Sequence, residues 1–501
     1  MISQLFAQHI ANEFPHQFTP RQQQAAEQIG EFLSDPRTEQ AFILRGYAGT
    51  GKTSLVAAVV RVWQKLQRPV VLMAPTGRAA KVFSLHAGLP AYTVHKVIYR
   101  QQAFKGEDTR FDRGFNPHKD TLYIIDEASM VANIGGNTLF GTGMLMDDMV
   151  QYIYSGSGCR MMLVGDTAQL PPVGEDDSPA LRPEVLKAYG LNVRMCQLTE
   201  VVRQAEASAV LKNATHLRMQ ISVFDGTTVE GAYAQDEEAY DAVNEEGMPL
   251  ITVTKRSEVK VVPGDELIDC LEASYRNWGA DDTIVVTRSN KRAIVYNNGI
   301  RNRIFDHEDI LTRGDMVMAV KNNYFWTAKA QEQLPKGEIL PIPFIANGDS
   351  AEIMHLRNQH SMHGFDFADA TLRFHDYDDY EIDCRVLLNT LQSEAPALTQ
   401  EESSRLYAAV HADYADIPNQ RERMKAIRLD PYYNALQIKY GYAMTCHKAQ
   451  GGQWHEVYID QGYLPDDLDP VAYLRWLYTA FTRTSANLYL VNWPREQTHF
   501  Q

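Results

Sequence analysis

The chain has 501 residues, of which 45% are hydrophobic, and this length predicts roughly three or four globular domains. Its net charge of −15 gives no overall basic footprint for nucleic acid, although binding depends on where charges lie rather than on their sum. The five scattered cysteines form no C-x-x-C pair, the N-terminus shows no secretory signal and no apolar run approaches a membrane span, so we expect a soluble, cytoplasmic protein without zinc, disulfides or a membrane partner.

A phosphate-binding loop is the strongest motif. Residues 46–53 read Gly-Tyr-Ala-Gly-Thr-Gly-Lys-Thr and lie between an apolar run at 41–44, which predicts a buried strand, and a helical pattern. Glycines let the backbone wrap a polyphosphate, and the N–H groups of the loop and the next helix point at the anion. We expect Lys52 to reach the outer phosphates and Thr53 to hold Mg²⁺. The predicted nucleotide-binding residues here are Gly46, Ala48, Gly49, Thr50, Gly51, Lys52, Thr53 and Ser54.

Short apolar strands alternate with helical patterns over residues 1–215. Further strands are predicted at residues 70–73, 122–125 and 161–164. Continuous apolar runs of this kind are typical of a parallel sheet covered on both faces, in which ligands bind at the carboxyl ends of the strands. The pattern therefore predicts an α/β nucleotide-binding domain.

Side chains suited to nucleotide hydrolysis follow these strands. Asp126 and Glu127 come directly after the strand at 122–125. We expect Asp126 to hold the Mg²⁺ shell and Glu127 to orient and deprotonate the attacking water. Gln169, after the next strand, is placed to sense the terminal phosphate, and Arg203 could stabilise charge on the transferred phosphoryl group.

A second α/β pattern occupies residues 216–304 and 436–501. Its strands are predicted at residues 250–253, 284–287, 437–440, 456–460 and 488–491. The interruption at 305–435 predicts an inserted module, which is strand-like at first and helical after Thr399, where a capping box with Glu402 begins a helix.

In the order of its motifs the chain resembles the superfamily 1 DNA helicases, and within them the RecD-like branch. The segments that carry the resemblance are the phosphate loop and residues 19–22, 74–80, 93–95, 126–130, 165–174, 442–451 and 478–483. The resemblance implies an α/β fold with two RecA-like P-loop motor domains, at 1–215 and at 216–304 with 436–501. It also implies a β-hairpin pin at about 100–120 and an SH3-like β module with a helical extension at 305–435.

The resemblance also implies an activity. The implied protein is a monomeric DNA helicase that depends on ATP and Mg²⁺. It would move 5′ to 3′ on single-stranded DNA, unwind forked duplex DNA and serve DNA repair or recombination. In this reading Gln22 contacts the adenine base and Gly451 the nucleotide. Arg483 is an arginine finger that the second motor domain delivers to ATP bound on the first, so that hydrolysis requires the cleft to close.

Strand-binding residues are implied in both motor domains. They are Pro75, Thr76, Thr93, His95, Thr445, His447 and Lys448. Most of these side chains carry hydroxyl, imidazole or ammonium groups, which can hold phosphates without reading bases, as a sequence-tolerant motor requires.

Three aromatic residues fall in the predicted pin: Phe104, Phe111 and Phe115. They could stack on the last base pair of a fork, or they could pack the hairpin onto its domain. The sequence favours neither alternative.

Two other functions stay open. One is a single-strand translocase, or RNA/DNA remodeller, that strips proteins or RNA from strands without separating duplexes. The other is a nucleotide-dependent interaction switch that binds no nucleic acid, which the negative net charge favours. The response of the ATPase rate to single-stranded DNA discriminates between a motor and a switch.

Overall fold

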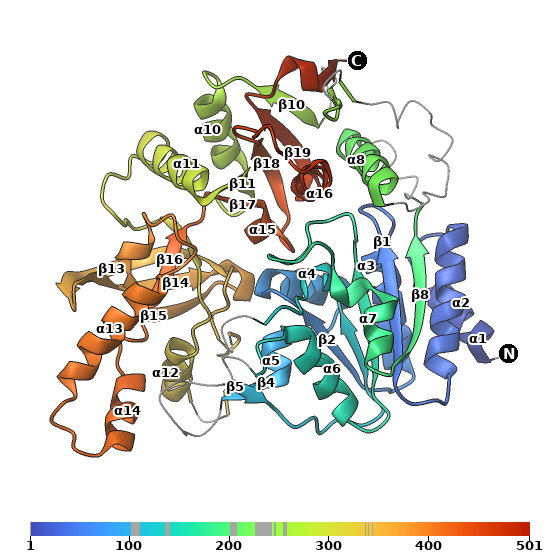
Figure 1. The fold of residues 1–501 in the computed structure, drawn as a ribbon, viewed down its shortest axis with the longest axis horizontal. Coiled ribbons are helices and arrows are strands. Elements are labelled where there is room, and N and C mark those ends of the chain that lie inside the picture. The colour runs from blue at the N-terminus through green and yellow to red at the C-terminus, as the bar shows by residue number, and fades with distance from the viewer. Residues whose placement is uncertain are drawn as a thin grey trace.

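Two parallel sheets and a closed barrel make up the described part of the chain (Figure 1). The computed structural model describes residues 2–101, 111–135, 141–200, 208–225, 243–244, 247–253, 258–335, 337–338, 340–342 and 344–500. Arg203 and Phe104 lie outside these residues, as does the side chain of Phe111. No helix within the described ranges is long and apolar enough to cross a membrane.

The first domain has a six-stranded parallel sheet in the order β3-β2-β6-β7-β1-β8. Its strands are β1 (Gln40–Gly46), β2 (Val70–Ala74), β3 (Ala91–Thr93), β6 (Leu122–Ile125), β7 (Arg160–Gly165) and β8 (Asn192–Leu198). Its helices are α1 (Ile2–Glu13), α2 (Pro20–Ser34), α3 (Lys52–Lys65), α4 (Gly77–Ala87), α5 (Val94–Ile98), α6 (Leu145–Ser155) and α7 (Pro183–Ala188), with short 3-10 turns η1 (Ala128–Met130) and η2 (Pro179–Leu181).

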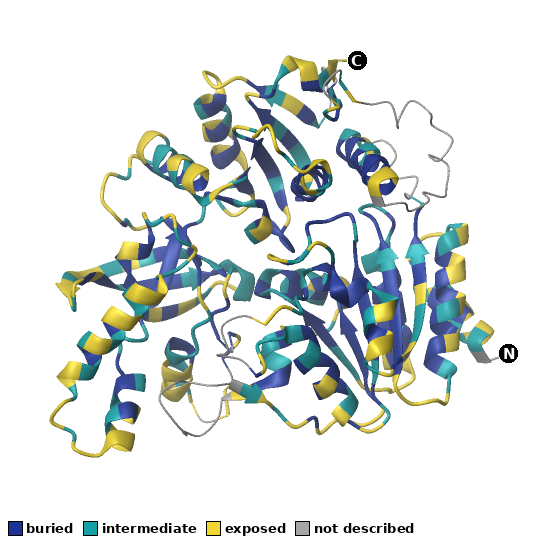
Figure 2. Ribbon diagram, viewed as in Figure 1, coloured by how far each residue is buried: buried dark blue, intermediate teal, exposed yellow. Residues whose placement is uncertain are grey.

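Alternation along β1 explains why this strand is apolar from residue 41 to residue 44. Phe42 and Leu44 pack in the cluster that α1, α2 and α3 form on one face of the sheet, whereas Ala41 and Ile43 pack in the cluster of α5, α6 and α7 on the other. Successive side chains of a strand point to opposite faces, so a strand covered on both sides must be apolar at every position. The prediction of a parallel sheet with two covered faces is confirmed, and the central strands β1, β6 and β7 are mainly dark blue in Figure 2.

The second domain has a five-stranded parallel sheet in the order β10-β19-β18-β11-β17. Its strands are β10 (Val259–Val262), β11 (Thr283–Thr287), β17 (Ala443–Thr445), β18 (Trp454–Asp460) and β19 (Thr484–Val491). Its helices are α8 (Ala209–Asp225), α10 (Leu267–Trp278), α11 (Asn290–Arg303), α15 (Cys446–Ala449) and α16 (Pro470–Phe481), with η7 (Arg495–Gln497) near the C-terminus. A separate parallel pair joins β9 (Ile251–Val253) to β20 (Thr498–Phe500).

A closed five-stranded barrel is inserted in the second domain. It consists of β12 (Met316–Ala319), β13 (Ser350–Met362), β14 (Phe365–Phe374), β15 (Tyr380–Leu387) and β16 (Leu436–Tyr440), with η5 (His375–Tyr377) and η6 (Leu388–Thr390). The prediction that residues 437–440 form a strand of the second parallel sheet is wrong. This strand, β16, pairs antiparallel with β12 and parallel with β15, and the chain joins the second parallel sheet only at β17.

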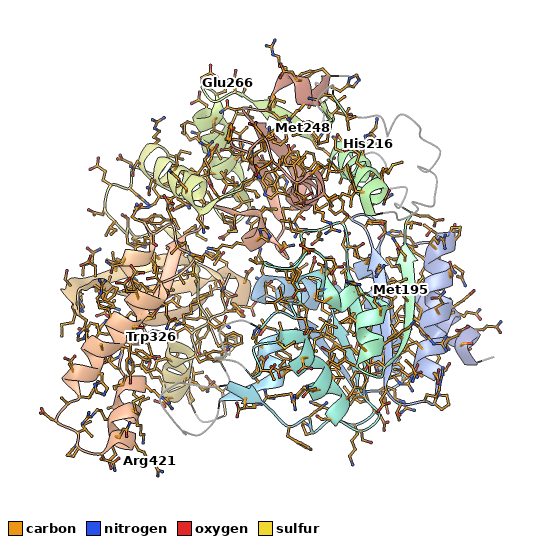
Figure 3. The ribbon with its side chains drawn as sticks, in the orientation of Figure 1. Met195, His216, Met248, Glu266, Trp326 and Arg421 are labelled. Carbon is orange, nitrogen blue, oxygen red and sulfur yellow. The ribbon has the colours of Figure 1, made fainter. Side chains whose placement is uncertain are left out.

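A helical extension projects from the barrel (Figure 1). The capping box of Thr399 and Glu402 is confirmed at the start of α13 (Gln400–Asp413), which is followed by α14 (Gln420–Arg428). The apolar side of both helices packs on Phe365 of β14. A further helix, α12 (Phe325–Gln333), is tied to this part of the chain because the indole N–H of Trp326, labelled in Figure 3, donates to the carbonyl of Asn434 at 2.8 Å.

Two short strands at the ends of the predicted pin pair antiparallel. They are β4 (Tyr99–Gln101) and β5 (Phe111–Arg113), with Tyr99 opposite Arg113. Phe115, just beyond β5, is 80% exposed and therefore does not pack the hairpin onto its domain.

The barrel also contacts the first domain, at the N-terminus of α4. A Cβ added to Gly77 would lie 2.3 Å from the Asp349 Oδ1 atom and 2.7 Å from the Tyr377 hydroxyl, so a larger residue there would have to displace these side chains. Lys81, one turn further on, donates to the carbonyl of His375 at 2.8 Å. The first domain, the second domain and the barrel thus form a continuous ring of contacts.

The carboxyl group of Asp349 should make stability depend on pH. Burial raises its pKa to about 7, although the N–H of Ala346, which donates to it at 2.7 Å, acts to lower the pKa. The pKa of an aspartate in an unfolded chain is about 3.9. Between these two pKa values the folded protein holds one proton more than the unfolded chain, so the free energy of unfolding falls as pH rises. Asp349→Asn keeps the shape and removes this titration. Its melting temperature relative to wild type should rise between pH 5 and pH 8; a constant difference in thermal unfolding scans would contradict this.

Candidate active site

The phosphate loop has the backbone that its glycines predict. Gly49 and Gly51 have φ of 74° and 78°, and Gly51 is the N-cap of α3, which begins at Lys52. A Cβ at Gly46 would lie 2.8 Å from Cγ of Lys52. The Lys52 ammonium donates to the carbonyl of Tyr47 at 2.9 Å, and the Thr50 hydroxyl donates to the same carbonyl at 2.7 Å. A single neutral carbonyl is a weak partner for an ammonium, so polyphosphate can compete for Lys52.

Gln22 lies beneath this loop. Its side-chain amide donates to the carbonyl of Thr50 at 3.0 Å, and its amide oxygen accepts from the N–H of Thr19 in a capping box. The residue is almost completely buried. Both ends of the amide are therefore engaged within the protein, and contact with a base requires one of these hydrogen bonds to be exchanged.

Residues of both domains line one pocket. From the first domain come Thr53, Asp126 and Glu127, and from the second come Gly451 and Arg483. The pocket therefore brings together the predicted metal ligands, the predicted water-activating carboxylate and the predicted arginine finger.

Asp126 and Glu127 form a tight carboxylate pair at the end of β6. The N–H of Glu127 donates to Oδ1 of Asp126 at 2.9 Å, and Glu127 has a left-handed φ of 49°, which is unusual for this residue type. Burial and the charge of Glu127 raise the pKa of Asp126 to about 7, with Lys52 acting in the opposite direction. Two carboxylates and the Thr53 hydroxyl are an oxygen donor set that suits Mg²⁺, whose charge would relieve this repulsion.

Arg483 is buried at the seam between the domains. Its guanidinium donates to the carbonyl of Thr479 at 2.9 Å, to the carbonyl of Gly452 at 3.2 Å and to the hydroxyl of Thr482 at 3.1 Å. All three partners belong to the second domain, so these hydrogen bonds orient the side chain while it lines the pocket of the first-domain carboxylates.

Gln169 lies in the turn after β7 and is also buried. Its side-chain oxygen has no hydrogen-bond partner among the described residues. A buried amide oxygen without a partner costs free energy, so the group is available to a ligand or a bound water.

Specific hydrogen bonds cross the seam next to Gln169. The N–H of Leu170 donates to the hydroxyl of Thr479 at 2.8 Å, and the side-chain amide of Gln450 donates to the carbonyl of Leu170 at 2.7 Å. Leu170 and Tyr47 of the first domain also belong to the hydrophobic cluster of the second. Sequence reasoning gave no role to Gln450 or Thr479, although both lie in segments that carry the resemblance.

The strand-binding candidates of the first domain begin helices. Thr76 caps α4 by accepting from the N–H of Ala79, and Thr93 caps α5 by accepting from the N–H of Lys96, each at 3.2 Å. His95 follows in α5, and burial lowers its pKa to about 4, so it is neutral at physiological pH. Pro75 precedes the cap of α4 and is partly exposed.

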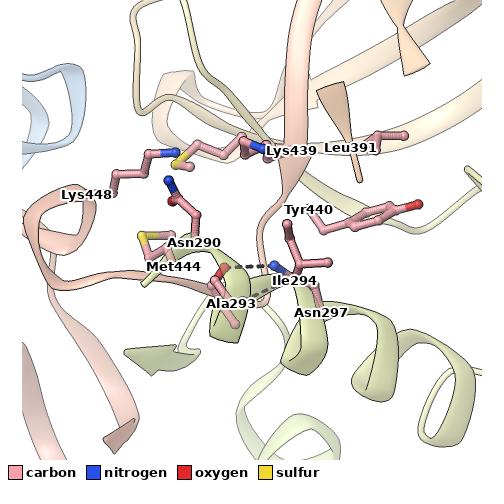
Figure 4. A pocket seen from close by; sticks show the side chains of 11 residues that line it. Asn290, Ala293, Ile294, Asn297, Leu391, Lys439, Tyr440, Met444 and Lys448 are labelled. Carbon is pink, nitrogen blue, oxygen red and sulfur yellow. Dashed lines mark hydrogen bonds between the residues drawn. The ribbon is translucent and has the colours of Figure 1, made fainter. Parts of the chain in front are cut away.

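The second-domain candidates lie at the carboxyl end of β17. Thr445 is the N-cap residue of α15, which contains the exposed His447 and the half-buried Lys448. Lys448 and Asn290 line a small pocket against Lys439 of the barrel (Figure 4). Burial lowers the pKa of Lys448. The turn that follows α15 approaches the first domain at the seam, where a Cβ on Gly451 would lie 3.1 Å from the Thr76 hydroxyl.

Comparison with known proteins adds two family matches. Residues 17–233 match the family described as AAA domain, and residues 440–491 match the UvrD-like helicase C-terminal domain. The first match falls on the domain with the phosphate loop and the second on the domain with Arg483.

Individual relatives are similar over different lengths. The ATP-dependent RecD2 DNA helicase of Deinococcus radiodurans is 30% identical over 190 residues, which are 38% of this chain and 23% of the relative. Uncharacterized protein R530 of Acanthamoeba polyphaga mimivirus is 22% identical over 536 residues, covering 94% of this chain and 99% of the relative. The chain thus spans under a quarter of the RecD2 relative. The solved Pif1 helicase from Bacteroides with ADP-AlF3 and ssDNA has 16% identity and a TM-score of 0.48, over 96% of this chain and 93% of that one.

The fold defines a two-domain P-loop nucleotide-binding protein. Its two parallel-sheet domains meet at one phosphate loop, and Arg483 of the second domain lines the same pocket as Asp126 and Glu127 of the first. The AAA and UvrD-like matches occur on these two domains in that order. The chain is thus similar to superfamily 1 helicases in both of its parallel-sheet domains, in the order that its motifs predicted.

Proposed function

We propose that the protein is an ATP-dependent DNA helicase that moves 5′ to 3′ on single-stranded DNA and unwinds duplex DNA. The observation that carries the proposal is the pocket in which Thr53, Asp126 and Glu127 of one domain meet Arg483 of the other. The name of the Deinococcus radiodurans relative, an ATP-dependent DNA helicase, supports the same activity. The direction of movement rests on the resemblance to the RecD-like branch.

Hydrolysis follows from the residues of this pocket. Lys52 exchanges the Tyr47 carbonyl for the outer phosphates, and Glu127 orients the attacking water and accepts its proton. Thr53 and Asp126 would hold Mg²⁺, which neutralises phosphate charge. Arg483 stabilises the charge that develops on the transferred phosphoryl group, and Arg203 and Gln169 are proposed to assist.

Movement follows because the two halves of the pocket belong to different domains. Closing around ATP and opening after hydrolysis change the distance between the strand-binding residues of the first domain and those of the second. Thr76, Thr93 and His95 would hold backbone phosphates on one side, and Thr445, His447 and Lys448 on the other. One chain supplies both sides, so we propose a monomer, acting in the cytoplasm in DNA repair or recombination.

Two assays together test this proposal. The ATPase rate should rise when single-stranded DNA is added, and a strand-displacement assay should separate duplexes with a 5′ tail but not those with a 3′ tail. Stimulation without displacement would favour a translocase. Absence of stimulation would favour a nucleotide-dependent switch.

Phe115 should affect unwinding and not hydrolysis. Stacking on a base is worth about 1–3 kcal/mol, so Phe115→Ala should slow displacement of a forked duplex at least about fivefold while the DNA-stimulated ATPase rate stays unchanged. The matched control is Phe500→Ala, which removes another exposed phenylalanine, on β20. Equal displacement rates for the two variants would exclude a role of Phe115 at the fork.

A further inference from the structure

Tyr478 joins the two domains through its hydroxyl group. The residue lies on α16 of the second domain and is almost completely buried. Its hydroxyl donates to Oδ2 of Asp166 at 2.6 Å and accepts from the N–H of Ala48 at 2.8 Å. Both partners belong to the first domain: Ala48 to the phosphate loop, and Asp166 to the turn after β7. One phenol therefore connects two separate parts of the nucleotide site to the helix that precedes Arg483.

On the phosphate loop, the bridge lies next to the residue that holds Lys52. Tyr47 accepts the Lys52 ammonium on its carbonyl, and its neighbour Ala48 donates to Tyr478. The Tyr47 ring packs under the guanidinium of Arg218 of α8 at 4.2 Å and lies in the hydrophobic cluster of the second domain. Tyr47, in the first turn of the loop, thus packs its ring against the second domain while its carbonyl accepts a hydrogen bond from Lys52.

On the other side, the bridge fixes the turn that carries Gln169. Asp166 uses its second oxygen, Oδ1, to accept from the N–H of Ala168 at 2.9 Å. Thr479, the neighbour of Tyr478, binds the N–H of Leu170 through its hydroxyl and accepts the Arg483 guanidinium on its carbonyl. A single turn of α16 therefore contacts the phosphate loop, the Gln169 turn and Arg483.

We propose that Tyr478 is a positioning residue whose hydroxyl transmits closure of the two domains to the phosphate loop and the Gln169 turn, so that both are aligned when Arg483 enters the site. This rests on the proposed ATPase function. The bridge suits a phenol because one hydroxyl can donate and accept at once, whereas an ammonium can only donate. Burial also raises the pKa of Tyr478 well above its ordinary value, so the hydroxyl stays protonated and can donate to Asp166.

The test compares two substitutions on the same helix. Tyr478→Phe removes the bridging hydroxyl and keeps the ring. The matched control is Tyr473→Phe, because Tyr473 is also buried on α16 but donates to Gln461 within the second domain. For Tyr478→Phe we expect the DNA-stimulated kcat to fall about tenfold or more with KM for ATP within about twofold, and for Tyr473→Phe we expect both constants to stay within about twofold of wild type. Similar melting temperatures of the two variants would show that folding is not the cause.

A double-mutant cycle identifies the partner. Because Asp166 and Tyr478 act through one hydrogen bond, the variant Asp166→Asn with Tyr478→Phe should be no slower than the slower single variant. The proposal is overturned if Tyr478→Phe has the same kcat as Tyr473→Phe, if it changes KM and not kcat, or if the effects in the cycle are additive. A wild-type protein without DNA-stimulated hydrolysis would instead refute the proposed function and, with it, this inference.

Discussion

Arg483→Ala should lower the maximal rate of ATP hydrolysis roughly 10³- to 10⁵-fold while ATP still binds. The guanidinium lines the pocket of Asp126 and Glu127 but comes from the other domain. In the proposed mechanism it meets the phosphates fully only when the domains close, so we expect its contribution to be larger in the transition state than in the bound ground state. The measurements are steady-state hydrolysis with single-stranded DNA and equilibrium binding of a fluorescent ATP analogue.

Two further variants separate this effect from misfolding and from loss of binding. Arg483→Lys keeps a positive charge but loses the planar fork that donates to Thr479 and Gly452, and it should restore little of the rate. Lys52→Ala should remove hydrolysis and also weaken binding, because we propose that Lys52 contacts the phosphates before and during the reaction. Hydrolysis by Arg483→Ala within tenfold of wild type would rule out the arginine finger.

Local signals made the first half of this site predictable. The phosphate loop needs glycines, a lysine and a threonine at neighbouring positions, and the structure has Gly51 in a left-handed conformation just before α3 begins. The carboxylates at Asp126 follow a strand that is apolar because helices cover both of its faces. In each case the residues that define the feature are adjacent in sequence, so a short stretch of sequence is enough to predict the feature.

The partners of a strand are not encoded in this local way. Residues 437–440 are buried in the structure, as their sequence predicted, but in the barrel. An apolar run reports that a strand is covered and not which strand it pairs with. Only residues 441 and 442 separate β16 of the barrel from β17 of the second sheet. The sequence therefore shows one continuous apolar pattern where the structure has two strands in two different sheets.

The hydrogen bonds of the seam were beyond sequence reasoning for the same reason. Tyr478 and Ala48 are 430 positions apart, and no periodicity or spacing relates them. The resemblance implied a role for Arg483, whereas it implied no role for Tyr478, five residues earlier. Its function emerges only when the atoms that its hydroxyl touches are known.

Asp315→Ala should destabilise the junction between the barrel and the second domain by about 3–5 kcal/mol. Arg301, at the end of α11, donates to both carboxylate oxygens of Asp315 at 2.8 Å, and both side chains are almost completely buried. The N–H of Thr312 and the hydroxyl of Tyr442 also donate to this carboxylate, at 2.7 and 3.2 Å. Removal of Asp315 leaves a buried guanidinium without its counter-charge.

The control is an arginine–carboxylate pair at the surface. Arg373 donates to Glu381 at 2.8 Å, but the two side chains are 32% and 43% exposed. Solvent screens such a pair, so Glu381→Ala should cost only about 0–1 kcal/mol. Urea denaturation followed by tryptophan fluorescence measures both variants, since Trp326 reports on the barrel region. The buried carboxylate also accepts more hydrogen bonds than the exposed one, so both burial and hydrogen bonding should make the Asp315 variant the less stable of the two. Equal destabilisation would show that the Arg301 pair does not hold this junction together.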